Sequence, residues 1–199
     1  MMAFTTLACA KINRWAVLQR FMLGCVVWAL AGTALSSGDF RVDNIVPRFE
    51  AELLSMDAQL TYRLSEKADQ ALTNGLPLEI QQTLQVQRKR KWWFNAAVVT
   101  QQRHYRIQFH ALSRRYVLTR LETGASRSFR DRQALLSALG RIEGWPVMRE
   151  SAVQALGPIQ LRLTTKLVRD ALPRVLRMAA WLDADWQLRG GPLVKEVQP

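Results

Sequence analysis

The segment "LPLEIQQTLQVQ", residues 76–87, shows most clearly the pattern that decides the fold. In it, Leu78, Ile80, Leu84 and Val86 alternate with polar residues, most of which are glutamines. A repeat of two residues places the apolar side chains on one face of a β-strand and the polar ones on the other. This alternation is typical of an antiparallel sheet with one buried and one solvated face.

The same alternation recurs along the chain and predicts further strands. "FEAELLS" and "QLTYRL" form a predicted hairpin with "MDA" as its turn, and Phe49, Ala51 and Leu53 share the apolar face of its first strand. Other segments that alternate are "RHYRIQFHAL", "RRYVLTRLE" and "IQLRLTTKL". Strands are therefore predicted over residues 49–55, 59–64, 76–87, 103–112, 114–122 and 159–167.

Two short helices are predicted between the strands. Ser65 is a suitable N-cap for a helix over residues 66–74, and Gly75 is a suitable residue to end it. In "DRQALLSALG", Asp131 is the predicted N-cap and Gly140 the predicted stop. Both helices are short, and we expect them to cover part of the buried face of the sheet.

Together these elements predict a mainly β (α+β) fold. We expect a single domain of about six to eight antiparallel strands, arranged as a sandwich or a strongly curved sheet, with two or three short helices. Residues 174–182 fit a helix or a strand equally well. The predicted boundaries are a signal peptide at 1–31, a linker at 32–48, the β-rich domain at 49–190 and a polar tail at 191–199.

The N-terminal segment has the features of a secretory signal peptide. Lys11, Arg14 and Arg20 are its only charged residues, and they precede the apolar run at 21–35, which contains an A-x-A-like site. This run is shorter than the about 20 residues that span a bilayer, which favours cleavage. An uncleaved signal anchor is the alternative.

Composition limits the chemistry of the exported part. Cys9 and Cys25 both lie in or before the apolar run, so the mature chain has no disulfide, thiol nucleophile or cysteine-ligated zinc. His104 and His110 share one strand face, roughly 20 Å apart, which is too far for one metal ion. The chain has 28 Lys and Arg against 16 Asp and Glu, a net charge of +12, which predicts attraction to an anionic partner.

Several motifs occur in an order that resembles a known family. They are "ALTNGLPLEI", "RKRKWWFN", "HYRIQFHALSRRYVL", "DRQALLSALGRIEGWPV", "ALPRVL" and "DWQL". Over roughly residues 45–190 this order is similar to that of the DUF4390 family of bacterial exported proteins. The resemblance implies export in proteobacteria and a compact β-rich domain, and it implies no known activity. Genes of the family often neighbour a two-component sensor kinase, so the resemblance also implies a link to envelope sensing.

The stretch "RKRKWWFN", residues 88–95, is the most prominent candidate for a binding surface. It continues the strand that begins at Leu78, and one of its two tryptophans is expected to anchor the sheet margin while the other stays available. Strict alternation would direct its first arginine to the apolar face, so either a bulge lies near 87–91 or the strand outruns the core. The predicted partner or polyanion surface comprises Arg88, Lys89, Arg90, Lys91, Trp92, Trp93, Arg106, Arg114 and Arg115.

The function predicted from these features is binding rather than catalysis. The sequence contains no P-loop, no G-x-S-x-G and no dinucleotide-binding motif, and no cofactor or metal is expected. We expect an exported noncatalytic domain, periplasmic or attached to the inner membrane, that binds another cell-envelope component, foremost a protein. The alternatives are direct binding of anionic lipid or an envelope polyanion by the basic and aromatic sheet margin, and a hydrolase with an unrecognised site. Nucleic acid is not an expected partner.

Overall fold

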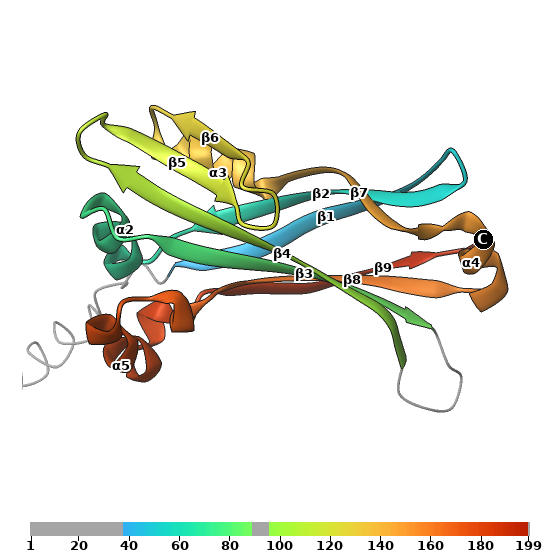
Figure 1. The fold of residues 1–199 in the computed structure, drawn as a ribbon. Coiled ribbons are helices and arrows are strands. Elements are labelled where there is room, and N and C mark those ends of the chain that lie inside the picture. Colours follow the sequence, from blue (N-terminus) through green and yellow to red (C-terminus); the bar gives the residue numbers. More distant parts are fainter. Residues whose placement is uncertain (1–37, 89–95, 199) are drawn as a thin grey trace, which may run out of the picture. The chain divides into compact units, whose positions relative to one another are not determined.

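The alternating segments form two antiparallel sheets that pack against each other in a computed structural model, which describes residues 38–88 and 96–198 (Figure 1). The smaller sheet has the strand order β1-β2-β7 and the larger one the order β6-β5-β4-β3-β8-β9. The predicted mainly β fold is confirmed, with nine strands in the described part of the chain. The strands are β1 (Asp39–Glu50), β2 (Leu53–Arg63), β3 (Leu78–Arg88), β4 (Ala96–His110), β5 (Arg115–Arg120), β6 (Ser126–Phe129), β7 (Arg141–Arg149), β8 (Ile159–Leu167) and β9 (Arg189–Val197).

Short helices lie at the two ends of the sheets and beside them. In Figure 1, α2 and α5 lie at one end of the sheets, α4 lies at the other end, and α3 lies beside β5 and β6. The 3₁₀ turns η1 (Arg169–Ala171) and η2 (Ala184–Trp186) flank α5. The helices are α2 (Glu66–Thr73), α3 (Arg132–Gly140), α4 (Glu150–Leu156) and α5 (Arg174–Leu182). No helix in the described part of the chain is long and apolar enough to cross a membrane.

The core lies between the two sheets, because each inner face supplies every second residue of its strands. β2 shows this most regularly, and its buried residues are Leu54, Met56, Ala58, Leu60 and Tyr62. β3 and β8 from the larger sheet supply leucines, isoleucines and Val86 from the other side. Burial of these side chains is the main favourable contribution to folding.

The two predicted helices are confirmed, with their caps. The Ser65 hydroxyl accepts a hydrogen bond from the Ala68 amide at 3.3 Å, and an Asp131 carboxylate oxygen accepts one from the Ala134 amide at 3.0 Å. Gly75 has a φ of 82°, the left-handed conformation that ends α2. Residues 174–182, which fitted a helix or a strand equally well, form α5.

The predicted first hairpin is wrong in its register. The turn is not at residues 56–58 but at Ala51 and Glu52, which have φ values of 48° and 59°. Such a two-residue turn normally carries Asn or Gly, so Ala51 and Glu52 provide no local sign of it. As a consequence Phe49 and Leu53 are exposed to 41% and 36% instead of facing inward.

The predicted linker and tail are largely strands. Most of the stretch 32–48 belongs to β1, an edge strand that tolerates Pro47. Most of the predicted polar tail belongs to β9. Its glycines fit this strand because a Cβ on Gly190 would lie 2.4 Å from the carbonyl oxygen of Phe40, where β9 passes β1.

β7 was missed because its alternation is interrupted. Gly144 has a φ of 55° and Pro146 follows two residues later, so Ile142 and Trp145 are both buried although they lie three positions apart in the strand. The β2–β7 ladder shifts register at this place. A local irregularity of this kind hides a strand from an analysis that depends on a period of two.

Candidate functional site

The described members of the predicted basic surface lie far apart along the larger sheet. Arg88 ends β3 opposite Ala96, and Arg106 lies roughly 30 Å further along β4, at about 3.3 Å per residue. Arg114 and Arg115 lie still further, in the turn after β4 and at the start of β5. The other predicted members lie outside the described residues: Lys89, Arg90, Lys91, Trp92 and Trp93.

Arg106 has a partner within its own sheet. Its Nη2 atom lies 2.7 Å and its Nε atom 3.1 Å from Oε1 of Glu79, which opposes it on β3. This cross-strand ion pair lies on the solvated face. It occupies the guanidinium and makes Arg106 a poor candidate for binding a polyanion.

Strict alternation along β3 would direct Arg88 to the apolar face, and the two expected explanations were a bulge near residues 87–91 and a strand that extends beyond the core. A bulge is present, but it lies in β4, where Val98 is the extra residue opposite Val86 and Gln87. β3 itself pairs with β8 without a register shift as far as Arg88. Arg88 is nevertheless exposed, at the last residue of β3.

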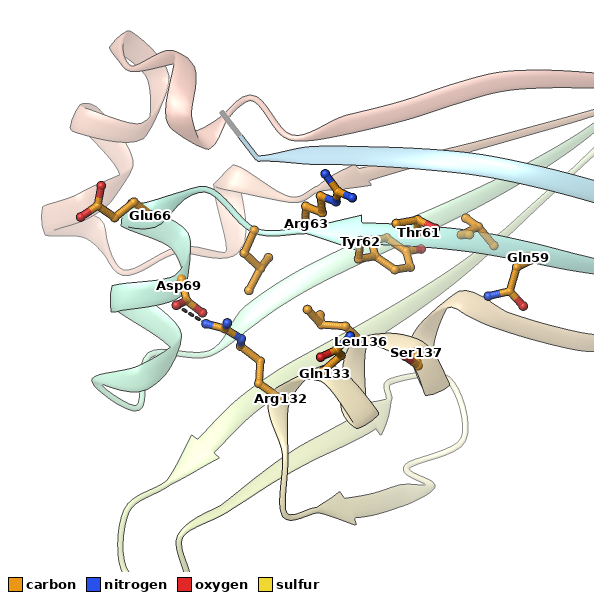
Figure 2. Close-up of a pocket in the computed structure, with 12 residues that line it drawn as sticks. Gln59, Thr61, Tyr62, Arg63, Glu66, Asp69, Arg132, Gln133, Leu136 and Ser137 are labelled. Atoms are coloured by element: carbon orange, nitrogen blue, oxygen red, sulfur yellow. Dashed lines mark ion pairs between the residues drawn. The ribbon is translucent and has the colours of Figure 1, made fainter. Parts of the chain in front are cut away.

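A groove runs beside the end of β2. Its volume is about 700 Å³, and it lies between the last residues of β2 and the helices α2 and α3 (Figure 2). Leu60, Leu64 and Leu136 supply its apolar lining. The rest of the lining is polar or charged and comprises Gln59, Thr61, Tyr62, Arg63, Glu66, Asp69, Arg132, Gln133 and Ser137.

One edge of β2 is free of a strand partner along this groove. The ladder between β2 and β7 ends at the pair Gln59 and Arg141, because β7 begins there. On its other edge β2 stays paired with β1 as far as Arg63, which opposes Asp39. No described strand therefore pairs with the groove side of β2 beyond Gln59. The backbone of Tyr62 lies within this unpaired stretch.

Gly140 explains where the free edge begins. A Cβ at Gly140 would lie 2.1 Å from the carbonyl oxygen of Leu60, so the end of α3 touches the β2 backbone only because this residue is glycine. The N–H and C=O of one residue in a strand point to the same side, and those of the next residue point to the other. Since the Leu60 carbonyl points toward Gly140, the N–H and C=O of Tyr62 point into the groove.

Charges lie at the helical end of the groove. Asp69 of α2 and Arg132 of α3 form an ion pair that joins the two helices (Figure 2). The second carboxylate oxygen of Asp69, Oδ1, is buried and has no hydrogen-bond partner among the described residues. Arg63 and Glu66 are exposed on the rim. The groove therefore offers charges of both signs around an apolar centre.

A row of buried polar groups holds the end of β2 against the larger sheet. The Tyr62 hydroxyl lies 3.1 Å from Oγ1 of Thr165 in β8 and accepts a hydrogen bond from Nε2 of Gln82 in β3 at 2.9 Å. The same Gln82 nitrogen donates to the Leu139 carbonyl at the end of α3, at 3.1 Å. Burial raises the pKa of Tyr62 to about 12, so its hydroxyl stays protonated above the pH at which an exposed tyrosine ionises, and it can donate to Thr165. These bonds fix the free edge in one position.

Trp145 joins the two sheets beside this row. Its Nε1 donates to Oε1 of Gln101 at 2.5 Å, and the Gln101 amide nitrogen donates to the Val147 carbonyl at 3.1 Å. The guanidinium of Arg103 lies 3.9 Å from the centre of the Trp145 ring. Burial and the nearby Arg120 lower the pKa of Arg103. This cluster pins β7 to β4 and is closed to ligands, since Trp145 is buried.

The two histidines and the other possible metal ligands lie as follows in the described residues. The described residues contain no group of three or more His, Cys, Asp or Glu side chains that could hold a metal ion. Nδ1 of His104 lies 3.2 Å from Glu122, and His110 is exposed at the end of β4.

The sequence contains a sign of the buried polar row beside the groove, but not of the groove itself. Gln82 occupies the apolar phase of "LPLEIQQTLQVQ", which indicates a buried polar contact at that position. The groove itself depends on where β7 begins, and that strand was missed.

Comparisons with known proteins place the chain in a family without naming an activity. No curated protein matches it, and no solved structure does. A family model matches residues 37–192, which is most of the chain and slightly more than the resemblance in the sequence covered. The chain therefore belongs to the DUF4390 family, a domain of unknown function.

Proposed function

We propose that this chain is an exported, noncatalytic domain that binds another protein of the cell envelope by adding an extended segment of that protein to the free edge of β2. The observation that carries the proposal is the groove of about 700 Å³ into which this edge opens. Strand addition to a sheet edge is a common way to recognise a peptide, because main-chain hydrogen bonds supply affinity and side-chain pockets supply specificity.

The free edge matches the length of a short strand. From Leu60 to Leu64 the groove side of β2 offers about 13 Å of backbone, which suits a segment of about four or five residues. Leu64 and Leu136 offer an apolar contact for one side chain of the segment. Arg63, Glu66 and Arg132 stand near enough to select its charged residues.

Two features support binding rather than catalysis. The described lining of the groove contains no histidine or cysteine. Its two carboxylates are Asp69, which is paired with Arg132, and Glu66, which lies exposed on the rim and accepts a hydrogen bond from Gln70. A general acid or base would need a titratable group free to exchange a proton with a substrate. Export is supported by the charges of Lys11, Arg14 and Arg20 and by the apolar run at 21–35 that follows them. The domain would then be periplasmic, or attached to the inner membrane if the leader is not cleaved.

Site-specific photocrosslinking in cells tests the proposal. Gln133 is exposed on α3 and lines the groove, so a photoreactive amino acid placed there should capture the partner. Ser151 is exposed on α4, outside the groove, and serves as the control position. We expect a crosslinked species from position 133 that position 151 does not give, and its crosslinked peptide should map to an extended segment of one envelope protein.

A blocking variant separates groove binding from chance proximity. Ser137→Trp introduces a large side chain at an exposed position that lines the groove, and Ser151→Trp is the matched control. Ser137→Trp should lower the yield from position 133 at least about tenfold, as loss of a central contact does in other interfaces. Equal crosslinking in both tryptophan variants, or no crosslink at position 133, would refute the proposal.

A further inference from the structure

The outer face of α5 exposes large apolar side chains. Met178, Trp181 and Leu182 are exposed to 76%, 56% and 88%, whereas Ala180 on the other side of the helix is fully buried. Residues three and four apart lie on the same face of a helix, so these three side chains form one continuous patch. Scattered exposed apolar residues are ordinary, but a cluster on one helix face marks an interaction surface.

Arginines surround this patch. Arg174 and Arg177 are exposed on α5, and the guanidinium of Arg169 lies 4.6 Å from the centre of the Trp181 ring. Arg169 also donates to the Ala180 carbonyl at 3.4 Å, and Arg177 to the Leu172 carbonyl at 3.2 Å, which brace the helix. The sequence of α5, "RVLRMAAWL", contains no acidic residue. The face is therefore both apolar and basic.

The segment around α5 is fixed to the rest of the domain. Lys67 of α2 forms ion pairs with Asp183 and with Asp185, the latter at 3.2 Å. The hydrogen bonds that Lys67 donates to these carboxylates raise its pKa, because they favour the charged ammonium. The Ser65 hydroxyl donates to the Asp185 carbonyl at 2.7 Å. These contacts attach the residues that follow α5 to α2, while the apolar face of α5 stays exposed.

The described chain begins beside this segment. Gly38 packs against the Ser65 amide nitrogen and the Leu188 side chain, which follows η2. Only Ser36 and Ser37 separate Gly38 from the end of the apolar run at residue 35. A chain this short spans at most about 11 Å. If the apolar run enters a membrane, covalent linkage keeps this end of the domain near the bilayer surface.

We propose that α5 is a docking helix for the surface of an anionic membrane. Met178, Trp181 and Leu182 enter the interface between headgroups and acyl chains, and Arg169, Arg174 and Arg177 meet the lipid phosphates. An apolar face flanked by arginines and a tryptophan is the pattern of helices that lie in a membrane interface. This inference goes beyond the proposed function and is independent of it, since α5 does not line the groove.

Fluorescence quenching by brominated lipids tests the inference on the full chain. The protein is reconstituted into vesicles of phosphatidylglycerol or of phosphatidylcholine whose acyl chains carry bromine. The difference between the wild type and Trp181→Phe isolates the emission of Trp181 from that of the other tryptophans. In phosphatidylglycerol we expect strong quenching of this difference signal and a shift of its emission to shorter wavelength.

Two variants serve as comparisons for the wild type, one without the arginines around α5 and one without an exposed leucine elsewhere. Each arginine near an anionic surface contributes to attraction, so the triple variant R169Q/R174Q/R177Q should weaken docking by on the order of tenfold or more. Leu112 is fully exposed in the turn after β4, and Leu112→Ser serves as a control that should change nothing. An unquenched Trp181 in phosphatidylglycerol, or equal quenching in phosphatidylcholine and in the arginine variant, would overturn the inference. Neither result affects crosslinking at Gln133, so the two proposals fail separately.

Discussion

Replacing Tyr62 by phenylalanine tests whether the buried polar row holds the free edge of β2 in place. The substitution removes only the hydroxyl, which lies 3.1 Å from Oγ1 of Thr165 and 2.9 Å from Nε2 of Gln82. The ring stays, so its edge-to-face contact with Phe40, at 4.8 Å between ring centres, is retained. The loss of stability therefore reports on the hydrogen bonds.

The two bonds set the expected magnitude. A buried hydrogen bond contributes about 1 kcal/mol, and a polar group left without a partner costs about 1–3 kcal/mol. Gln82 keeps its bond to the Leu139 carbonyl, whereas Thr165 loses its partner in the smaller sheet. We expect Tyr62→Phe to lower the free energy of unfolding by about 2 kcal/mol. For a domain of this size that corresponds to a fall in Tm of roughly 4–8 °C.

Urea unfolding followed by circular dichroism measures the change. Tyr116→Phe is the control, since Tyr116 is half-buried against Phe109 and the described residues give its hydroxyl no hydrogen-bond partner. It should stay within about 0.5 kcal/mol of the wild type. A double-mutant cycle of Tyr62→Phe with Thr165→Val should show a coupling of about 0.5–1.5 kcal/mol. A cost below about 0.5 kcal/mol, or no coupling, would refute the structural role of the row.

Three further outcomes are expected. Because burial raises the pKa of Tyr62 to about 12, the native state keeps a proton that the unfolded state loses near pH 10. The free energy of unfolding should therefore fall by up to about 3 kcal/mol as the pH rises from about 10 to 12. Urea titrations at pH 9 and pH 11 should show that Tyr62→Phe lacks this pH-dependent loss. Gly140→Ala should cost about 1–3 kcal/mol or more by thermal unfolding, because its Cβ would strike backbone, and more than Gly124→Ala, where the strain is a φ of 70° in open space among the described residues. Glu79→Gln should cost less than about 1 kcal/mol in chemical unfolding, since the bond to Arg106 is a partly exposed ion pair; a larger cost would give this pair a structural role that the geometry does not indicate.

The fold was predictable where a strand has neighbours on both sides and an uninterrupted period. β3 and β8 meet this condition, so Leu84 and Leu163 face the core as their phase requires. The caps at Ser65 and Asp131 were also predictable, since a cap depends on a few consecutive residues. Local rules and simple periods therefore determine about half of the elements and the class of fold.

The remaining features depend on contacts between distant residues. The turn at Ala51 and Glu52 uses left-handed backbone at residues that do not favour it, and the β1–β2 ladder on both sides enforces it. The free edge of β2 exists because Gly140 meets Leu60, and no local pattern connects these positions. For the same reason the groove could not be predicted from the sequence.

The candidate site in the structure is the groove beside β2, whereas the sequence indicated the basic stretch at residues 88–95. Arg106 appeared available in the sequence and is paired with Glu79 in the structure. The spacing of Met178, Trp181 and Leu182 was visible in the sequence, but which side of α5 is buried depends on the packing of Ala180. Charge and aromatic content can identify candidate residues, whereas only the tertiary structure shows which of them remain exposed.

Hydrogen exchange at the Tyr62 amide tests most directly whether the free edge of β2 accepts a partner strand. In the full chain alone this amide, which points into the groove, should exchange faster than the amides of β3, which is paired on both edges. When the partner is crosslinked through a photoreactive residue at position 133, exchange at the Tyr62 amide should slow by at least about tenfold, as for an amide that gains a ladder hydrogen bond. The exchange of the α4 amides should stay unchanged. An identical exchange rate at Tyr62 with and without the partner would contradict strand addition at β2.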